Sequence, residues 1–284
     1  MSTGFPPQRP SAAPDPREIV RYECMVSNAD ALRVSCFVTV FATMAIWELL
    51  SSTRALTVRR ARRWPTNVAM LVLGLALVRV AIPLTLAETA QWAGRLEWGL
   101  LHAIDVPVAV AVPLAVVVLD LVVYAQHVIF HRVPLLWRVH RVHHADTDVD
   151  VTTGLRFHPI ELLLSAVIKT AVVVALGAPA LAVVTFEVLL NATSMVTHGN
   201  VALPRSLDLL VRRLFVTPDM HRLHHSVDPL DHGSNFGFSF SVWDRIFDTY
   251  RRDSVVGTMA MTLGLGYDSG QACAVGRALR IPFH

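Results

Sequence analysis

A chain of 284 residues, 53% of them hydrophobic and only 17% charged, is too apolar for an ordinary soluble domain and long enough for one integral membrane domain. The net charge is +3, and all basic side chains but one lysine are arginines. The sequence has no basic run with interleaved aromatic residues, so a nucleic-acid partner is not favoured. Three widely spaced cysteines exclude a disulfide framework or a C-x-x-C metal site.

The chain begins with a proline-rich stretch. Residues 1–17 hold five prolines and lack the charged-then-apolar order of a cleavable signal peptide. We expect a disordered tail over residues 1–30, with targeting by the first membrane helix.

Two apolar segments then predict membrane spans within residues 31–104. The first runs over Ala31–Leu50 and the second over Thr66–Leu86, where Arg79 is unusual for a span. The loop between them is expected on the cytoplasmic side because it carries five arginines: Arg54, Arg59, Arg60, Arg62 and Arg63. Residues 88–105 read as a short external loop.

A third span is expected from Val106 to about His127. A longer apolar region, Leu162–Asn191, is interrupted at Gly177-Ala178-Pro179, so it predicts a helical hairpin or two full spans. Either arrangement returns His198 to the side where the third span ends.

The predicted fold is therefore an all-α integral membrane protein of about four transmembrane helices or helical hairpins. Residues 105–250 contain all the histidine clusters, with a helix expected in the membrane interface after Asn200, and residues 251–284 form a C-terminal tail without clear pattern. A histidine-rich cap is expected on the cytoplasmic side.

Histidines at helical spacing carry the functional prediction. His127 and His131 are four residues apart, and two H-x-x-H-H groups supply imidazoles three and four residues apart. On a helix each group would lie on one face and point at one place. Three converging groups supply more ligands than one metal ion binds, so two metal ions are expected. The groups are His127/His131, His140/His143/His144 and His221/His224/His225.

Several metal functions can be compared. A zinc peptidase would need the glutamate of H-E-x-x-H, but Val128 and Arg222 occupy those positions. A metal transporter or sensor without oxygenase activity stays as the competing hypothesis, although it would be expected to repeat ionisable groups along a path through the membrane. A redox centre with two metals at the membrane surface fits best.

The ordered motifs closely resemble the fatty acid hydroxylase / sterol desaturase superfamily over about residues 105–250. They are H-x-x-x-H, W-R-x-H-x-x-H-H, R-F-H-P-x-E, the lone His198, H-x-x-H-H and N-x-G. The resemblance implies a membrane-bound non-haem di-iron oxygenase. Its implied metal ligands are His127, His131, His140, His143, His144, His198, His221, His224 and His225.

Residues that support the ligands are also expected, because a metal-bound imidazole donates its other N–H to an acceptor. Asp120 lies two helical turns before His127, and Asp219 is either such an acceptor or a helix N-cap. His158 is a ligand, a residue that donates to a ligand, or a cap before Pro159. Asn235 is a further candidate, as are Asp146, Asp148, Asp150 and Glu161, while His232 is placed outside the ligand set.

The resemblance implies O2-dependent oxidation of a C–H bond in a membrane lipid, with two iron ions as cofactor. Hydroxylation is favoured over desaturation, and the substrate is left open among a fatty acyl chain, a sterol-like lipid and an acylated polar lipid. Electrons are expected from an external ferredoxin, rubredoxin or small cytochrome with its reductase. The arginine-rich composition favours a bacterial inner membrane.

Overall fold

The computed structural model describes residues 16–254, 256–266 and 273–284, and this part of the chain is all-helical apart from loops and two isolated bridges. The fold class predicted from the sequence is confirmed. The elements are α1 Pro16–Leu50, α2 Arg60–Ala81, α3 Leu86–Arg95, α4 Leu100–Ala103, α5 Val108–Arg132, α6 Pro134–His144, η1 Thr153–Leu155, α7 Pro159–Leu176, α8 Ala180–Thr197, α9 Arg205–Val211, α10 Pro218–His224, α11 Pro229–His232, α12 Val242–Ile246, α13 Val275–Ala278 and η3 Ile281–Phe283.

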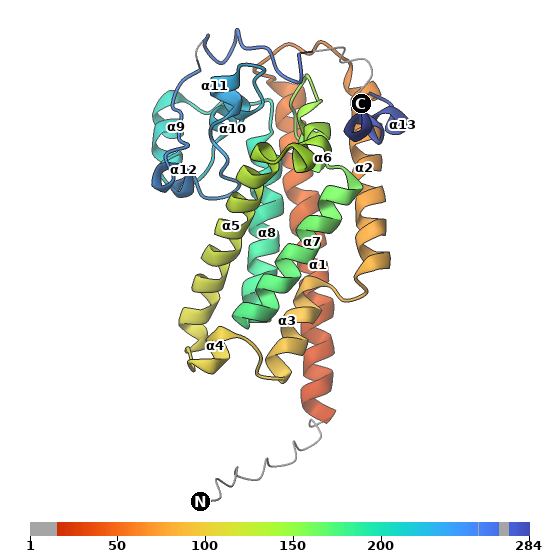
Figure 1. Ribbon diagram of the computed structural model, residues 1–284, viewed down its shortest axis with the longest axis vertical. Coiled ribbons are helices and arrows are strands. Elements are labelled where there is room, and N and C mark those ends of the chain that lie inside the picture. Colours follow the sequence, from red (N-terminus) through yellow and green to blue (C-terminus); the bar gives the residue numbers. More distant parts are fainter. Residues whose placement is uncertain (1–15, 255, 267–272) are drawn as a thin grey trace, which may run out of the picture.

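The long helices form a bundle with short helices gathered at one end of it as a cap, while α3 and α4 lie toward the opposite end (Figure 1). Within the bundle α1 and α5 pack against α8, while α2 packs against α7. The cap contains α6 and α9 to α12, and α13 lies beside the first half of α2 at the same end. The three histidine motifs therefore meet where the bundle joins the cap.

Five segments are long and apolar enough to cross a membrane: 29–50, 60–103, 108–132, 159–176 and 180–197. Their outer surfaces carry exposed apolar side chains such as Val38, Val72 and Val110, whereas the cap buries many charged groups. Spans whose outer surfaces are apolar, joined to a cap that buries its charged groups, are the arrangement that a bilayer favours. The chain is built as an integral membrane protein.

The apolar region interrupted by Gly177-Ala178-Pro179 forms two helices of 18 residues each. Gly177 ends α7 with a left-handed φ of 69°, and Pro179 is the N-cap of α8. A side chain at Gly177 would also collide with the carbonyl oxygen of Trp98 at 2.6 Å. The turn therefore needs glycine for its backbone angle and for close packing.

The two ends of the chain differ from the expectation. Residues 1–15 of the expected tail lie outside the described residues, but α1 begins at Pro16 and makes residues 16–30 helical. Pro16 suits a first helical position, and no proline follows it in the helix. The C-terminal segment is packed, because α13 contacts α2 and Arg141 donates to the carbonyl oxygens of Ile281 and His284.

The arginine-rich loop between α1 and α2 does more than mark a membrane side. Arg54 donates to the backbone carbonyl oxygens of residues 258, 259 and 261, and Arg63 is buried among three aspartates. Arg59 and Arg62 remain exposed. Part of the positive charge used to predict topology therefore holds the cap onto the bundle.

Candidate metal centre

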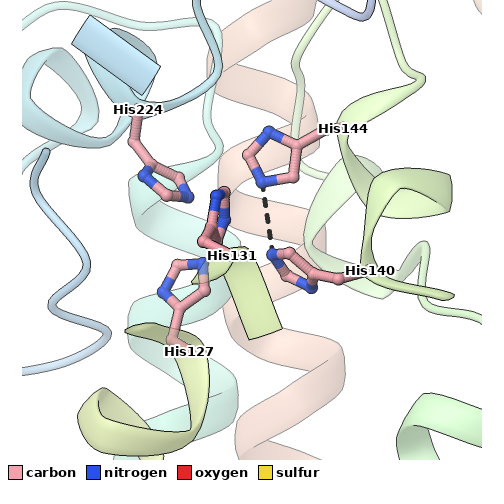
Figure 2. Close-up of side chains that lie close together, drawn as sticks. All are labelled: His127, His131, His140, His144 and His224. Carbon is pink, nitrogen blue, oxygen red and sulfur yellow. Dashed lines mark hydrogen bonds between the residues drawn. The ribbon is translucent and has the colours of Figure 1, made fainter. Parts of the chain in front are cut away.

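Nine histidine side chains converge in two groups beneath the cap. The five-histidine cluster contains His127, His131, His140, His144 and His224 (Figure 2). The four-histidine cluster contains His143, His198, His221 and His225. Within each cluster one nitrogen of every ring lies within 4.8 Å of the others, which is close enough for a common metal ion.

The two H-x-x-H-H motifs are each divided between the clusters. In α6, His140 and His144 point into the five-histidine cluster while His143 points into the four-histidine cluster. In α10, His224 points into the five-histidine cluster and His221 points into the four-histidine cluster. His225, the C-cap of α10, accompanies His221. The prediction that each motif points at one place was wrong, because neighbouring helical positions differ by about 100°.

Helix α5 supplies the remaining pair of the five-histidine cluster. His127 and His131 lie one turn apart with ring centroids separated by 5.0 Å. Helix α5 then ends at Arg132, because Pro134 forces an extended Val133 and starts α6 at once. This tight joint lets α6 turn back and place His140 4.9 Å from His127, measured between ring centroids.

Five rings are oriented by a hydrogen bond from Nδ1, which leaves Nε2 directed into a cluster. The acceptors are backbone carbonyl oxygens in four cases and the Glu161 carboxylate in one. Such partners fix the tautomer and the ring orientation of a metal-binding imidazole. The pairs are His127 with Phe236 at 2.7 Å, His140 with Glu161 at 2.6 Å, His143 with Arg156 at 3.2 Å, His198 with Ser194 at 2.6 Å and His224 with Ser234 at 2.8 Å.

Other ring nitrogens are buried without a hydrogen-bond partner among the described residues, among them Nε2 of His127, His131 and His224. A buried unpaired nitrogen is costly unless it binds something. In the four-histidine cluster the Nε2 atoms of His143 and His221 lie 3.0 and 2.9 Å from that of His198. These separations suit neighbouring ligands about 2.1 Å from one ion, so the residues fit a metal.

The clusters are also in the protonation state that metal binding requires. Burial lowers the pKa of His140 to about 3 and that of His198 to about 4, and it lowers the pKa of His144 and His225 well below the usual value. These imidazoles are therefore neutral at pH 7. A neutral imidazole is the form that binds a metal.

Asp120 does not contact a histidine ring. Its carboxylate accepts hydrogen bonds from Trp243 Nε1 at 2.8 Å and from the backbone N–H of Phe240 at 3.3 Å. It thereby fixes the segment that contains Phe236, whose carbonyl oxygen accepts from His127. The expected hydrogen bond between Asp120 and a histidine ring is not formed, because the cap segment that contains Phe240 and Trp243 donates to this carboxylate instead.

Asp219 and Asn235 also act through the backbone or another side chain. Asp219 pairs with Arg222, and the N-cap of α10 is Thr217, whose side chain accepts from Met220 N. Asn235 adopts a left-handed φ of 55° and donates from Nδ2 to the carbonyl oxygen of Met220 at 3.1 Å. Both residues shape the ends of α10 and neither touches an imidazole.

His158 belongs to neither cluster. It is the N-cap of α7, and its Nδ1 accepts from the backbone N–H of Ile160 at 3.2 Å. Of the roles left open by the sequence, the contacts of His158 are those of the helix cap. His232, placed outside the ligand set, donates to the carbonyl oxygen of His224 and stacks on that ring at 5.8 Å between centroids.

Reasoning from the sequence missed most of the groups that orient the rings. Glu161 was a minor candidate, and its position in the first turn of α7, opposite α6, depends on the fold. The carbonyl oxygens of Arg156, Ser194, Ser234 and Phe236 leave no signal in residue type. Any residue could have supplied them.

A buried ionic network joins the centre to the bundle. Arg63 of α2 donates to Asp146 at 2.8 Å and also contacts Asp148 and Asp150, with both Arg63 and Asp146 only 2% exposed. Burial alone would raise the pKa of Asp146, but Arg63 and Arg156 outweigh it and hold that pKa below its usual value. The loop after α6 is thus fixed by charge.

A cavity of about 130 Å³ reaches the five-histidine cluster from between the spans. Its lining includes His127, His140 and Glu161 together with Phe130, Phe157 and Phe238. No member of the four-histidine cluster is among its lining residues. A substrate approaching through this cavity would meet the five-histidine cluster first.

Comparison with known proteins agrees with this architecture. Residues 112–249 match the family model described as fatty acid hydroxylase. The chain is 30% identical to an ornithine lipid hydroxylase of Rhizobium tropici, over 51% of this chain and 43% of that protein. It is 24% identical to an alkylglycerol monooxygenase of Caenorhabditis elegans and 25% identical to the human one, over 47% and 46% of this chain and 26% and 28% of those proteins.

The matched region runs from α5 to the loop after α12 and contains all nine histidines of both clusters. The chain spans less than half the length of the relatives it matches, and no solved structure matches it. Over residues 112–249, slightly less than half of its length, this chain resembles the fatty acid hydroxylase family, as the order of its histidine motifs predicted.

Proposed function

We propose that this chain is a membrane-bound di-iron oxygenase that hydroxylates a C–H bond of a membrane lipid. The observation that carries the proposal is the pair of neutral, buried histidine clusters, one of which lines a cavity between membrane-spanning helices. Five and four ligands exceed what one ion takes, which supports one ion in each cluster. Iron is favoured over zinc because the matched family and the named relatives are hydroxylases and monooxygenases.

Two iron ions, when bound, would supply the reduction of O2 and the oxidation of an unactivated C–H bond. The chain's own contribution is positional. Glu161 and the four carbonyl oxygens aim the imidazoles, and the aromatic walls of the cavity exclude water around the lipid. No side chain is assigned as a separate acid or base.

Hydroxylation is favoured over desaturation because the relatives named above act as a lipid hydroxylase and as monooxygenases. Electrons would come from an external ferredoxin, rubredoxin or small cytochrome with its reductase. The exposed arginines between α1 and α2 support a cytoplasmic cap, and the Rhizobium relative is consistent with a bacterial inner membrane.

The test is Mössbauer spectroscopy with metal analysis on protein grown in iron-57 medium. The matched variant is His143→Ala/His224→Ala, which removes one histidine from each cluster. We expect close to two irons per chain in a coupled pair, lost in the double variant. One exchangeable zinc, unchanged by the double variant, would overturn the oxygenase proposal and favour metal transport or sensing.

A further inference from the structure

A second cavity, of about 430 Å³, lies beside the one that reaches the five-histidine cluster. It is bounded by α1, α2, α3, α7 and α8, and the two cavities share the lining residues Leu162, Lys169 and Asn191. Exposed apolar residues near it, Val80 and Leu84, place its mouth on the lipid-facing side of the bundle. Together the cavities form a path from the bilayer to the metal centre.

The charges in this path are unusual for a membrane interior. The larger cavity is lined by three cations, Arg33, Arg79 and Lys169, and by one carboxylate, Glu187. Arg33 pairs with both Glu187 and Asp30. Arg79 is exposed and donates to the carbonyl oxygen of Pro83, and among the described residues it forms no ion pair within 4.0 Å. Ionisable groups within membrane spans are costly and mark sites of function.

Lys169 is the more informative of the two cations that lack a direct ion pair among the described residues. It is the only lysine of the chain and lines both cavities where they meet. Within the described residues its ammonium forms no ion pair within 4.0 Å and no hydrogen bond, although the carboxylate of Glu187, which Arg33 binds, attracts it electrostatically. A lysine that only stabilised the bundle would be expected to have a partner.

Its distance from the metal centre is set by one helix. Lys169 lies eight residues after Glu161 on α7, and Glu161 accepts the hydrogen bond from His140. Eight residues of α-helix rise about 12 Å. A group bound at Lys169 would thus lie on the order of 12 Å from a carbon at the five-histidine cluster.

We propose that Lys169, assisted by Arg79, binds the anionic group of the lipid substrate and so sets which carbon reaches the metal centre. This inference rests on the proposed function for the identity of the reacting end, but the binding site itself does not require turnover. The substrate class is a lipid with a carboxylate or phosphate group. A neutral lipid would leave the ammonium of Lys169 without a hydrogen-bond partner where the two cavities meet.

Lipid retention by purified protein in neutral detergent tests the proposal. Native mass spectrometry would compare palmitate, dioleoyl phosphatidic acid and dioleoylglycerol. We expect at least one of the two anionic lipids to be retained at least tenfold better than the diacylglycerol. Preference for palmitate would identify a carboxylate as the ligand, and preference for phosphatidic acid would identify a phosphate.

The variants separate a binding role from a structural one. Lys169→Met should remove the anionic preference, Lys169→Arg should retain it, and Arg138→Gln, which changes an exposed cation of the cap, should leave it unchanged. Equal retention of the three lipids by the wild type, or an unchanged preference in Lys169→Met, would overturn the proposal.

Iron content measured in the same samples keeps the two proposals distinguishable. An iron-free wild type that still prefers anionic lipids would contradict only the oxygenase proposal. An iron-loaded wild type without the preference would contradict only the lipid-binding site.

Discussion

The five-histidine and four-histidine clusters lie side by side, yet their surroundings differ. The five-histidine cluster lines a cavity and has a carboxylate, Glu161, behind one of its rings. The four-histidine cluster is oriented by the backbone carbonyl oxygens of Arg156 and Ser194, and it lines none of that cavity. If the proposed function holds, the first cluster would face the substrate and the second would hold the ion that lies farther from the cavity.

Removing one ligand from each cluster separately should have the largest effect. His140→Ala and His221→Ala should each lose about one of two irons, and hydroxylation should fall by more than the roughly 100-fold that loss of an outer partner costs. Metal analysis and turnover measure this. His102→Ala, outside both clusters, is the control. Retention of both irons in either variant would contradict separate ion sites.

The next prediction concerns a support that both clusters share. Arg63→Gln should destabilise the protein by about 3–5 kcal/mol, because three buried aspartates lose their cation. Thermal unfolding in detergent measures the change. Arg62→Gln, at an exposed neighbouring position, should stay within about 0.5 kcal/mol of wild type. Equal shifts in the two variants would show that the buried network adds nothing.

Glu161→Gln should weaken metal binding at one cluster more than at the other. Because its carboxylate accepts from His140, its loss should weaken metal binding at the five-histidine cluster by about 10–100-fold. Iron titration followed by Mössbauer spectroscopy would resolve the two sites. A similar weakening of both sites would mean that they are not distinguished by their supports.

His158 provides the smallest expected effect. His158→Ala should cost about 1 kcal/mol through loss of the α7 cap, and His158→Asn should restore it. Iron content should be unchanged in both variants. A loss of iron on His158→Asn would place this residue among the ligands instead.

The comparison also shows what the sequence could predict. The histidine spacings and apolar segments reveal the spans, the convergence at one end and the family, because periodicity reports which residues share an element. They could not assign His143 to a different cluster from His140, since that depends on how α8 and α10 are placed against α6. Asp120 was misassigned for a related reason: its partner Trp243 is 123 residues away.

Helices α6 and α10 each contribute to both clusters, and this interleaving has a consequence for how the centre fills. An ion that binds to one cluster fixes the rotation of both helices and so aligns the ligands of the other. The second ion then binds to a site whose ligands are already ordered, so it loses less conformational entropy on binding, which is positive cooperativity. Iron titration of the wild type should therefore show that occupation of one cluster raises the affinity of the other, while each cluster keeps its own ion site.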